Sequence, residues 1–176
     1  MKTIRFALLV IALIGRTSGL AEFRAGVAVR VVTPDPLLPV SGGVGPSNPV
    51  SKKQGDLTVR AMVLENNNTK VAFVSTDFLG FPSVLGDRVR RQIKSIPPNH
   101  ILIGATHTHS APDAYGFPNN KGGTDANLIY LDLVCNKAAE AINDAITNLK
   151  PASLKVGTGK AKGKIAYNYY APDLYD

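Results

Sequence analysis

Residues 101–110 read Ile-Leu-Ile-Gly-Ala-Thr-His-Thr-His-Ser, a short apolar run that passes directly into a polar segment with two histidines. An apolar run of this length predicts a buried β-strand, here over residues 100–106. A second strand-like run, residues 70–76, ends in the same way at Asp77. Open α/β sheets bind ligands at the carboxyl ends of their strands. If these two strands are parallel neighbours, Asp77 and the two histidines therefore lie close together.

The rest of the chain predicts further strands and two helices. The asparagines of residues 66–69 predict a hairpin turn, because asparagine tolerates positive φ. Apolar residues at helical spacing predict one helix that begins near Pro82 and ends at Pro97, and a second over residues 125–149. The expected strands are residues 25–33, 57–65, 70–76, 100–106 and 153–157, with a long irregular loop over residues 34–55. Together these elements predict an α/β fold, a mixed β-sheet flanked by helices.

The N-terminal residues have the pattern of a secretory signal peptide. Basic residues precede a short apolar run at residues 6–14, and the small residues Gly19 and Ala21 follow it. This pattern predicts a signal peptide over residues 1–21, and hence a secreted or periplasmic protein. Arg16 is unusual so close to a cleavage site, so a retained N-terminal anchor is the alternative.

The formal net charge of +7 does not by itself indicate a nucleic-acid-binding protein. Three of the 20 basic residues lie in the signal segment, so its removal lowers the charge to +4. The other basic residues are dispersed, and aromatic residues do not alternate with them, so we expect no nucleic-acid partner. The single cysteine, Cys135, cannot form an internal disulfide, and its apolar surroundings in the sequence predict a buried, inert thiol.

The two histidines, His107 and His109, are the strongest candidates for chemistry. In an extended strand, a His-x-His pair places both imidazoles on one side, roughly 6–7 Å apart. Neutral imidazole is a common zinc ligand, so one ring could hold a metal while the other steadies or protonates a substrate. The polar neighbours that could orient the rings are Thr106, Thr108, Ser110 and Asp113. Without further information, a pair of surface histidines that cap a strand end is the alternative.

The segment from Gly104 to Pro112 resembles the GTHTHSGPG segment of the neutral/alkaline (non-lysosomal) ceramidase family. The order of the preceding elements is similar as well. An AGVA-type strand begins at Ala25, an R-x-x-V/L-type strand follows at residues 60–64, and a VAFVS-x-D strand follows at residues 71–77. An isolated HTHS is a weak signal, whereas this ordered set is more specific. Ala111 and Asp113 replace family glycines, which implies a different pocket wall after the histidines.

The resemblance implies a zinc-dependent amide hydrolase that acts on N-acyl sphingosine-type or related N-acyl substrates, with association at a membrane surface as one option. Carried onto this chain, His107 would be a zinc ligand and His109 would contact the substrate or its tetrahedral intermediate. Zinc would activate a bound water and polarise the amide carbonyl. Residues 22–176 would be the N-terminal part of the catalytic domain.

The family's further zinc ligands, another histidine, a glutamate and a tyrosine, lie beyond the matched segment. No histidine follows His109 in this sequence. We therefore expect an incomplete catalytic domain, a fragment that alone binds zinc weakly and hydrolyses nothing. Two alternatives remain open. One is a metal-dependent phosphoesterase or amidohydrolase that uses the His-x-His pair, and the other is a non-catalytic exported binding module with incidental histidines.

Overall fold

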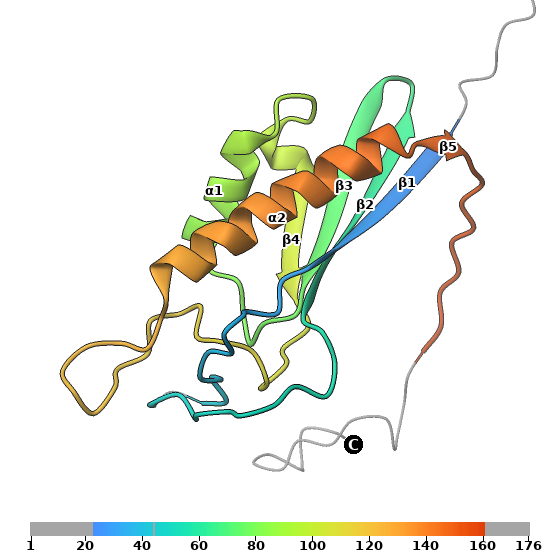
Figure 1. Ribbon diagram of the computed structural model, residues 1–176. Coiled ribbons are helices and arrows are strands. Elements are labelled where there is room, and N and C mark those ends of the chain that lie inside the picture. Colours follow the sequence, from blue (N-terminus) through green and yellow to red (C-terminus); the bar gives the residue numbers. More distant parts are fainter. Residues whose placement is uncertain (1–22, 44, 161–176) are drawn as a thin grey trace, which may run out of the picture.

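The computed structural model describes residues 23–43 and 45–160 (Figure 1). The expected signal peptide over residues 1–21, and residues 161–176, lie outside the described residues. The elements are β1 (Arg24–Val31), β2 (Thr58–Asn66), β3 (Thr69–Thr76), α1 (Ser83–Gln92), the short 3-10 helix η1 (Pro98–His100), β4 (Ile101–Ala105), α2 (Leu128–Thr147) and β5 (Lys150–Pro151). Within the described part of the chain, no helix combines the length and apolarity needed to cross a bilayer.

The strands form one five-stranded sheet in the order β4-β3-β2-β1-β5. β1, β2 and β3 are joined as antiparallel neighbours, whereas β3 and β4 are parallel. The β2–β3 hairpin turns at Asn67 and Asn68, whose φ values of 49° and 64° are the positive values that asparagine tolerates. The mixed sheet with two helices confirms the predicted α/β class, and the predicted hairpin is confirmed with it.

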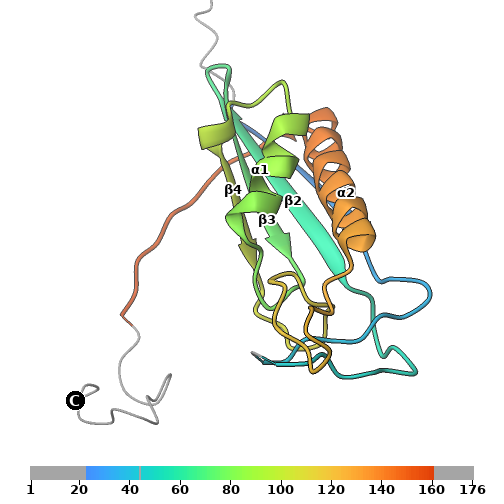
Figure 2. The same ribbon diagram turned by 90° about the vertical axis from the view of Figure 1, so that its left-hand side faces the viewer.

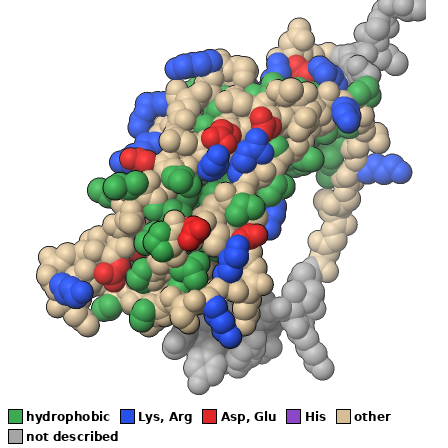
Figure 3. Space-filling model, viewed as in Figure 1, with side chains coloured by type: hydrophobic (Ala, Val, Ile, Leu, Met, Phe, Trp, Pro, Cys, Tyr) green, Lys and Arg blue, Asp and Glu red, His purple; other side chains and the backbone are tan. Residues whose placement is uncertain are grey.

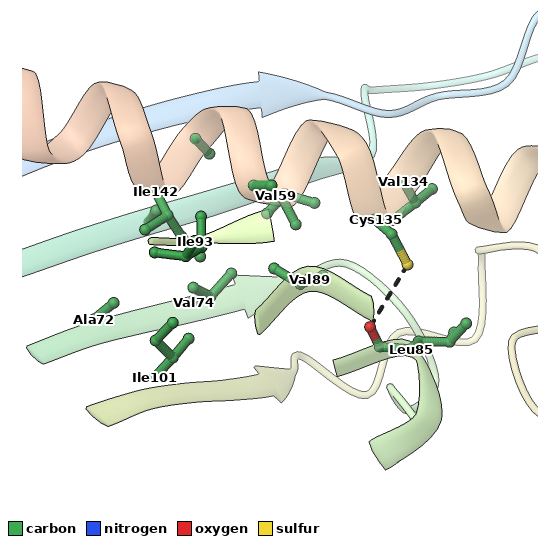
Figure 4. Packing of buried hydrophobic residues seen from close by; sticks show 14 of the residues in the cluster. Val59, Ala72, Val74, Leu85, Val89, Ile93, Ile101, Val134, Cys135 and Ile142 are labelled. Atoms are coloured by element: carbon green, nitrogen blue, oxygen red, sulfur yellow. Dashed lines mark hydrogen bonds between the residues drawn. The ribbon is translucent and has the colours of Figure 1, made fainter. Parts of the chain in front are cut away.

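Both helices lie on one side of the sheet (Figures 1 and 2). α2 crosses β1 and β2, while α1, which connects β3 to β4, packs beside it. The buried apolar side chains of helices and strands meet in a single core (Figure 4). Cys135 is part of this core, as predicted. Its Sγ lies 3.7 Å from the carbonyl oxygen of Leu85, and burial raises the pKa of its thiol to about 11.

Two details of the predicted elements are wrong. Residues 153–157 form no strand and are exposed, and the chain instead pairs with β1 earlier, through β5. Helix α1 ends at Gln92 rather than at Pro97, because Ile93 adopts an extended conformation with φ −97° and ψ 118°. The apolar periodicity continues past the helix end because Ile93 and Ile96 are buried in the core without being helical.

The helical side of the molecule carries charges of both signs (Figure 3). Lysine and arginine side chains are scattered over this face, with aspartate and glutamate between them. Several are joined in ion pairs that connect elements, including Arg30 with Glu140 and Asp144, and Arg88 with Asp132. A mixed charge distribution of this kind is typical of a solvated surface.

The opposite side of the sheet, which we call the outer face, is apolar. Its side chains align across the strands in two rows. The first row is Val27, Met62, Phe73 and Leu102, and the second is Val29, Arg60, Ser75 and Gly104. Neither helix covers these rows.

Candidate metal and substrate site at the strand ends

The carboxyl ends of β3 and β4 meet, as the sequence predicted. Thr76 and Ala105 are register partners, and the chain continues the pairing by one residue, since the Thr106 N–H donates to the Thr76 carbonyl at 2.9 Å. The Thr106 hydroxyl also donates to the Asp77 carboxylate at 3.3 Å. Asp77 is thereby joined to the residue directly before His107. The condition of the prediction, that the two strands are parallel neighbours, is confirmed, and Asp77 contacts Thr106 at the start of the histidine segment.

Asp77 anchors the strand ends. Its carboxylate accepts hydrogen bonds from both the backbone N–H and the hydroxyl of Thr58, at 2.9 and 2.8 Å, and it pairs with Arg60 at 3.1 Å. Burial by itself would raise the pKa of the Asp77 carboxyl. The hydrogen bonds from Thr58 and the charge of Arg60 outweigh burial and hold this pKa below its ordinary value. Asp77 therefore carries a negative charge at neutral pH and fastens β2 to β3 and β4.

We expect Asp77→Asn to lower the free energy of unfolding by about 2 kcal/mol at pH 7, because hydrogen bonds to a charged acceptor are lost. The folded-state pKa lies below the ordinary 3.8, so this stabilisation is complete above pH 3.8 and is lost as the pH falls through the lower folded value. Urea unfolding at pH 7 and at pH 3 measures the difference between the two proteins, which should shrink at pH 3. Asp87→Asn, at an exposed carboxylate on α1, is the control. Equal stabilities at pH 7 would contradict the anchoring role.

His107 is held in an unusual backbone conformation. Its φ is +63°, in the left-handed region that a residue other than glycine rarely adopts. The prediction of an extended His-x-His segment is therefore wrong at this position, because β4 ends at Ala105 and the chain turns immediately afterwards. Strained backbone of this kind occurs often at ligand sites. The turn directs the His107 ring toward the segment that follows β3.

The His107 ring is fixed by a backbone carbonyl. Its Nδ1 lies 2.7 Å from the carbonyl oxygen of Leu79. A carbonyl can only accept, so Nδ1 carries a hydrogen, and in the neutral ring the lone pair is on Nε2. A histidine that binds a metal characteristically donates its other ring N–H to a carbonyl or carboxylate in this way. The orientation and tautomer of His107 therefore fit those of a metal ligand.

His109 lies beside His107 on the same exposed segment. The two ring centroids are 5.1 Å apart, and the rings are nearly perpendicular, at 85°. A Cβ added to Gly42 would come within 3.6 to 3.8 Å of His109, so the loop after β1 passes close beneath this residue. That loop is tied in place where the Ser41 N–H donates to the Ala111 carbonyl at 2.8 Å. Despite the turn at His107, the two imidazoles form one cluster.

The polar neighbours do not orient the rings as expected. Asp113 is buried, and its carboxylate accepts the backbone N–H groups of Tyr115, Gly116 and Phe117 at 2.8 to 3.1 Å. It shapes the loop after the histidines instead. Thr106 binds Asp77, and the Thr108 hydroxyl accepts from the Ser110 N–H at 3.3 Å. No hydrogen bond joins any of these side chains to an imidazole among the described contacts.

A cavity lies next to the histidine segment. It has a volume of about 310 Å³ and is bounded by Ser110 and Pro112 on one side and by the segment that joins β1 to β2 on the other. Its walls are mainly apolar, and Lys52 and Lys53 lie among the lining residues. The apolar lining residues are Pro34, Leu37, Leu38, Val40, Val50 and Leu57. This volume is at the lower end of the range of small-molecule sites, about 300 to 1,000 Å³.

The described residues contain no group of three or more His, Cys, Asp or Glu side chains arranged to hold a metal ion. Asp77 is engaged by Thr58, Thr106 and Arg60, which leaves His107 and His109 as the available donors of the segment. Two imidazoles are fewer than the three protein ligands of a catalytic zinc site. The described residues therefore fit part of a zinc site, with His107 as the best-oriented ligand.

Sequence reasoning missed the groups that position the histidines. The Leu79 carbonyl is a backbone group, so no residue type marks it in the sequence. Gly42 belongs to a glycine cluster that indicates a loop but not its contact with His109. Thr58 begins a strand, and only the folded pairing brings it to Asp77.

The arrangement defines an α/β domain with a candidate ligand site at the carboxyl ends of adjacent parallel strands. No family model matches the sequence, and no curated protein matches it. Solved structures that match its fold include two ceramidase structures. A ceramidase complexed with C2 has a TM-score of 0.59 and 18% identity, over 74% of this chain and 22% of the ceramidase chain.

The second structure is the neutral ceramidase from Pseudomonas aeruginosa, with a TM-score of 0.55 and 17% identity over the same shares of the two chains, 74% and 22%. The chain therefore shares its fold with part of these ceramidases. It spans about a fifth of the length of each matched structure.

Proposed function

We propose that the chain carries one part of the active centre of an exported, zinc-dependent amide hydrolase resembling neutral ceramidase. The observation that carries this proposal is the hydrogen bond between His107 Nδ1 and the Leu79 carbonyl, which leaves Nε2 as a metal-binding atom. The fold shared with two ceramidase structures supports the reaction class. The GATHTHSAP segment, residues 104–112, adds separate support, because it depends on the identity of the residues and not on the shape of the backbone.

In this proposal, His107 holds the metal through Nε2, and the bond to Leu79 fixes the ring. Bound zinc would supply a water activated near neutral pH and a Lewis acid for the amide carbonyl. His109, with its ring centroid 5.1 Å from that of His107, lies close enough to contact the carbonyl oxygen of a substrate bound there. As a hydrogen-bond donor, it would stabilise negative charge that develops on this oxygen.

The cavity beside Ser110 supports an N-acyl substrate. Its apolar walls suit an aliphatic chain, and it adjoins the histidine segment, so a bound chain would place its linkage near the imidazoles. The substrate is therefore proposed as an N-acyl compound, of which N-acyl sphingosine is one. Export by the N-terminal segment, residues 1–21, and contact with a membrane surface belong to the same proposal.

The remaining ligands would come from polypeptide beyond the described residues. The chain alone is accordingly expected to bind zinc weakly and to hydrolyse no N-acyl substrate. Equilibrium dialysis with zinc and an assay of N-acyl sphingosine hydrolysis measure both properties. Tight, stoichiometric zinc on the purified chain would contradict this part of the proposal.

The reaction class is tested on the longest product of the gene. If the genomic frame continues past Asp176, a histidine and a Glu/Tyr pair in that continuation are the expected further zinc ligands of this product. We expect it to hydrolyse N-acyl sphingosine or another N-acyl compound, and we expect His107→Gln to abolish the hydrolysis. Hydrolysis of a phosphoester but of no N-acyl compound would favour the rival metallohydrolase class. A product that retains no zinc would favour a binding module.

A further inference from the structure

The outer face of the sheet has the properties of an interface. Four apolar side chains, Val27, Met62, Phe73 and Leu102, follow one another in register across β1, β2, β3 and β4. They are 39 to 63% exposed, and Val29 and Val31 extend the apolar surface along β1 at 52 and 55%. Monomeric soluble proteins rarely expose a contiguous apolar patch of this kind.

The neighbouring row of the same face is hollow over β3 and β4. Ser75 and Gly104 have small side chains or none, and a Cβ added to Gly104 would meet no atom within 4 Å. A depression of about 570 Å³ spans the two rows. The first row therefore forms a ridge of large apolar side chains, and beside it Ser75 and Gly104 form a groove over β3 and β4. Val29 and Arg60 continue the second row on β1 and β2.

The face carries a single charged side chain, Arg60, in its two rows. Its guanidinium pairs with Asp77 at 3.1 Å, at the carboxyl end of the sheet. Covering the face with apolar surface would therefore not leave this charge without a partner. A polar or anionic ligand, in contrast, would find no unpaired cation in these rows.

We propose that the outer face binds the outer face of a second copy of this chain, so that the protein is a dimer of two sheets packed face to face. A twofold axis places the ridge of each copy over the groove of the other copy. The surface is therefore self-complementary. Packed sheets interdigitate side chains in this manner, about 10 Å apart. The helices of both copies then lie on the outside, where their mixed charges remain in solvent.

The size of the face is sufficient for such a dimer. Four strands of five to nine residues, spaced about 4.8 Å apart with a rise of about 3.3 Å per residue, cover roughly 480 Å² per copy. Two copies together bury roughly 1,000 Å², which is about the minimum for a specific interface. His107 and His109 follow the end of β4, beyond the two rows of this face.

The proposal is tested by the mass of the purified chain in solution, measured by light scattering after size exclusion and by sedimentation velocity. We expect a dimer. The double variant Met62→Glu/Phe73→Glu should weaken dimerisation by at least about 100-fold, because association would bury two carboxylates in an apolar interface. The single variant Val29→Lys, on β1, is also expected to weaken dimerisation.

The matched control is Ile129→Glu, which changes an apolar side chain that is 85% exposed on α2, away from the face. This variant should remain dimeric, and circular dichroism should show the same fold in all proteins. A monomeric wild-type chain at micromolar concentration would overturn the proposal and would leave a layer of other polypeptide as the occupant. A dimer that survives both outer-face variants, or a polydisperse aggregate, would overturn it as well.

Discussion

Replacing Gly26 with alanine should destabilise the domain by about 3 kcal/mol, the upper end of the usual cost of overpacking. A Cβ at this position would lie 2.0 Å from the carbonyl oxygen of Ala145 and 2.9 Å from the backbone nitrogen of Leu149. Both atoms belong to the C-terminal end of α2 and its cap, which are backbone and cannot rotate away as a side chain would. The helix must therefore shift off β1, and the core beneath it loses contacts.

Thermal unfolding followed by circular dichroism measures this effect, with an expected decrease in Tm of roughly 10 °C. Gly55→Ala is the matched control. A Cβ at Gly55 meets no atom within 4 Å, so its effect should stay within about 0.5 kcal/mol. Equal stabilities of the two variants would contradict the close contact between the α2 backbone and Gly26 on β1.

His107→Gln should reduce the affinity of the chain for zinc by at least about 100-fold, equivalent to about 2.7 kcal/mol. Glutamine removes the imidazole Nε2 that we propose as the metal-binding atom, while its amide can still donate to the Leu79 carbonyl. A loss of zinc affinity would therefore be due to the missing Nε2 atom and not to a lost hydrogen bond with Leu79. NMR titration with zinc suits the weak binding expected of the chain alone.

The three histidines allow an internal comparison in the same NMR experiment. Before zinc is added, long-range proton–nitrogen spectra should show the Nδ1–H tautomer for His107, because Nδ1 donates to a carbonyl. His100 lies at the opposite end of β4, with its Nδ1 3.2 Å from the Lys70 carbonyl, so His100→Gln is the matched control and should leave zinc binding unchanged. If zinc changed the chemical shifts of His100 instead of those of His107, the proposal that His107 is the metal ligand would be refuted.

The elements that could be predicted from the sequence are those with a local cause. Asn67 and Asn68 supply the positive φ of the hairpin, and the long apolar stripe of α2 is periodic over its whole length. The strand predicted at residues 153–157 is wrong because a short valine-containing run does not by itself provide a neighbouring strand. β1 is paired instead by Lys150 and Pro151, which directly follow the helix.

The position of the candidate site could be predicted from the sequence, but the arrangement of its side chains could not. The polar residues at two strand ends indicate where it lies, and the parallel pairing of β3 with β4 confirms their meeting. The conformation of His107 could not be foreseen, because its left-handed φ depends on where β4 stops and on a carbonyl 28 residues away. The single exposed face of the sheet was also unforeseen, because its exposed side chains are mostly apolar and the strands therefore lack the alternation of apolar and polar residues that marks a half-covered sheet.

The contacts that hold the His107 segment have a consequence for the order of folding. The β2–β3 hairpin is closed by a turn of two asparagines, whereas Asp77 meets Thr58 across 19 residues and His107 meets Leu79 across 28. Closing a longer loop costs more chain entropy. We therefore expect the imidazole pair to assemble late, after the hairpin, and to be released first when the native state opens locally. The region that would do the chemistry is thus also expected to be less protected against amide exchange than the β2–β3 hairpin, and a bound ligand should raise the protection there first.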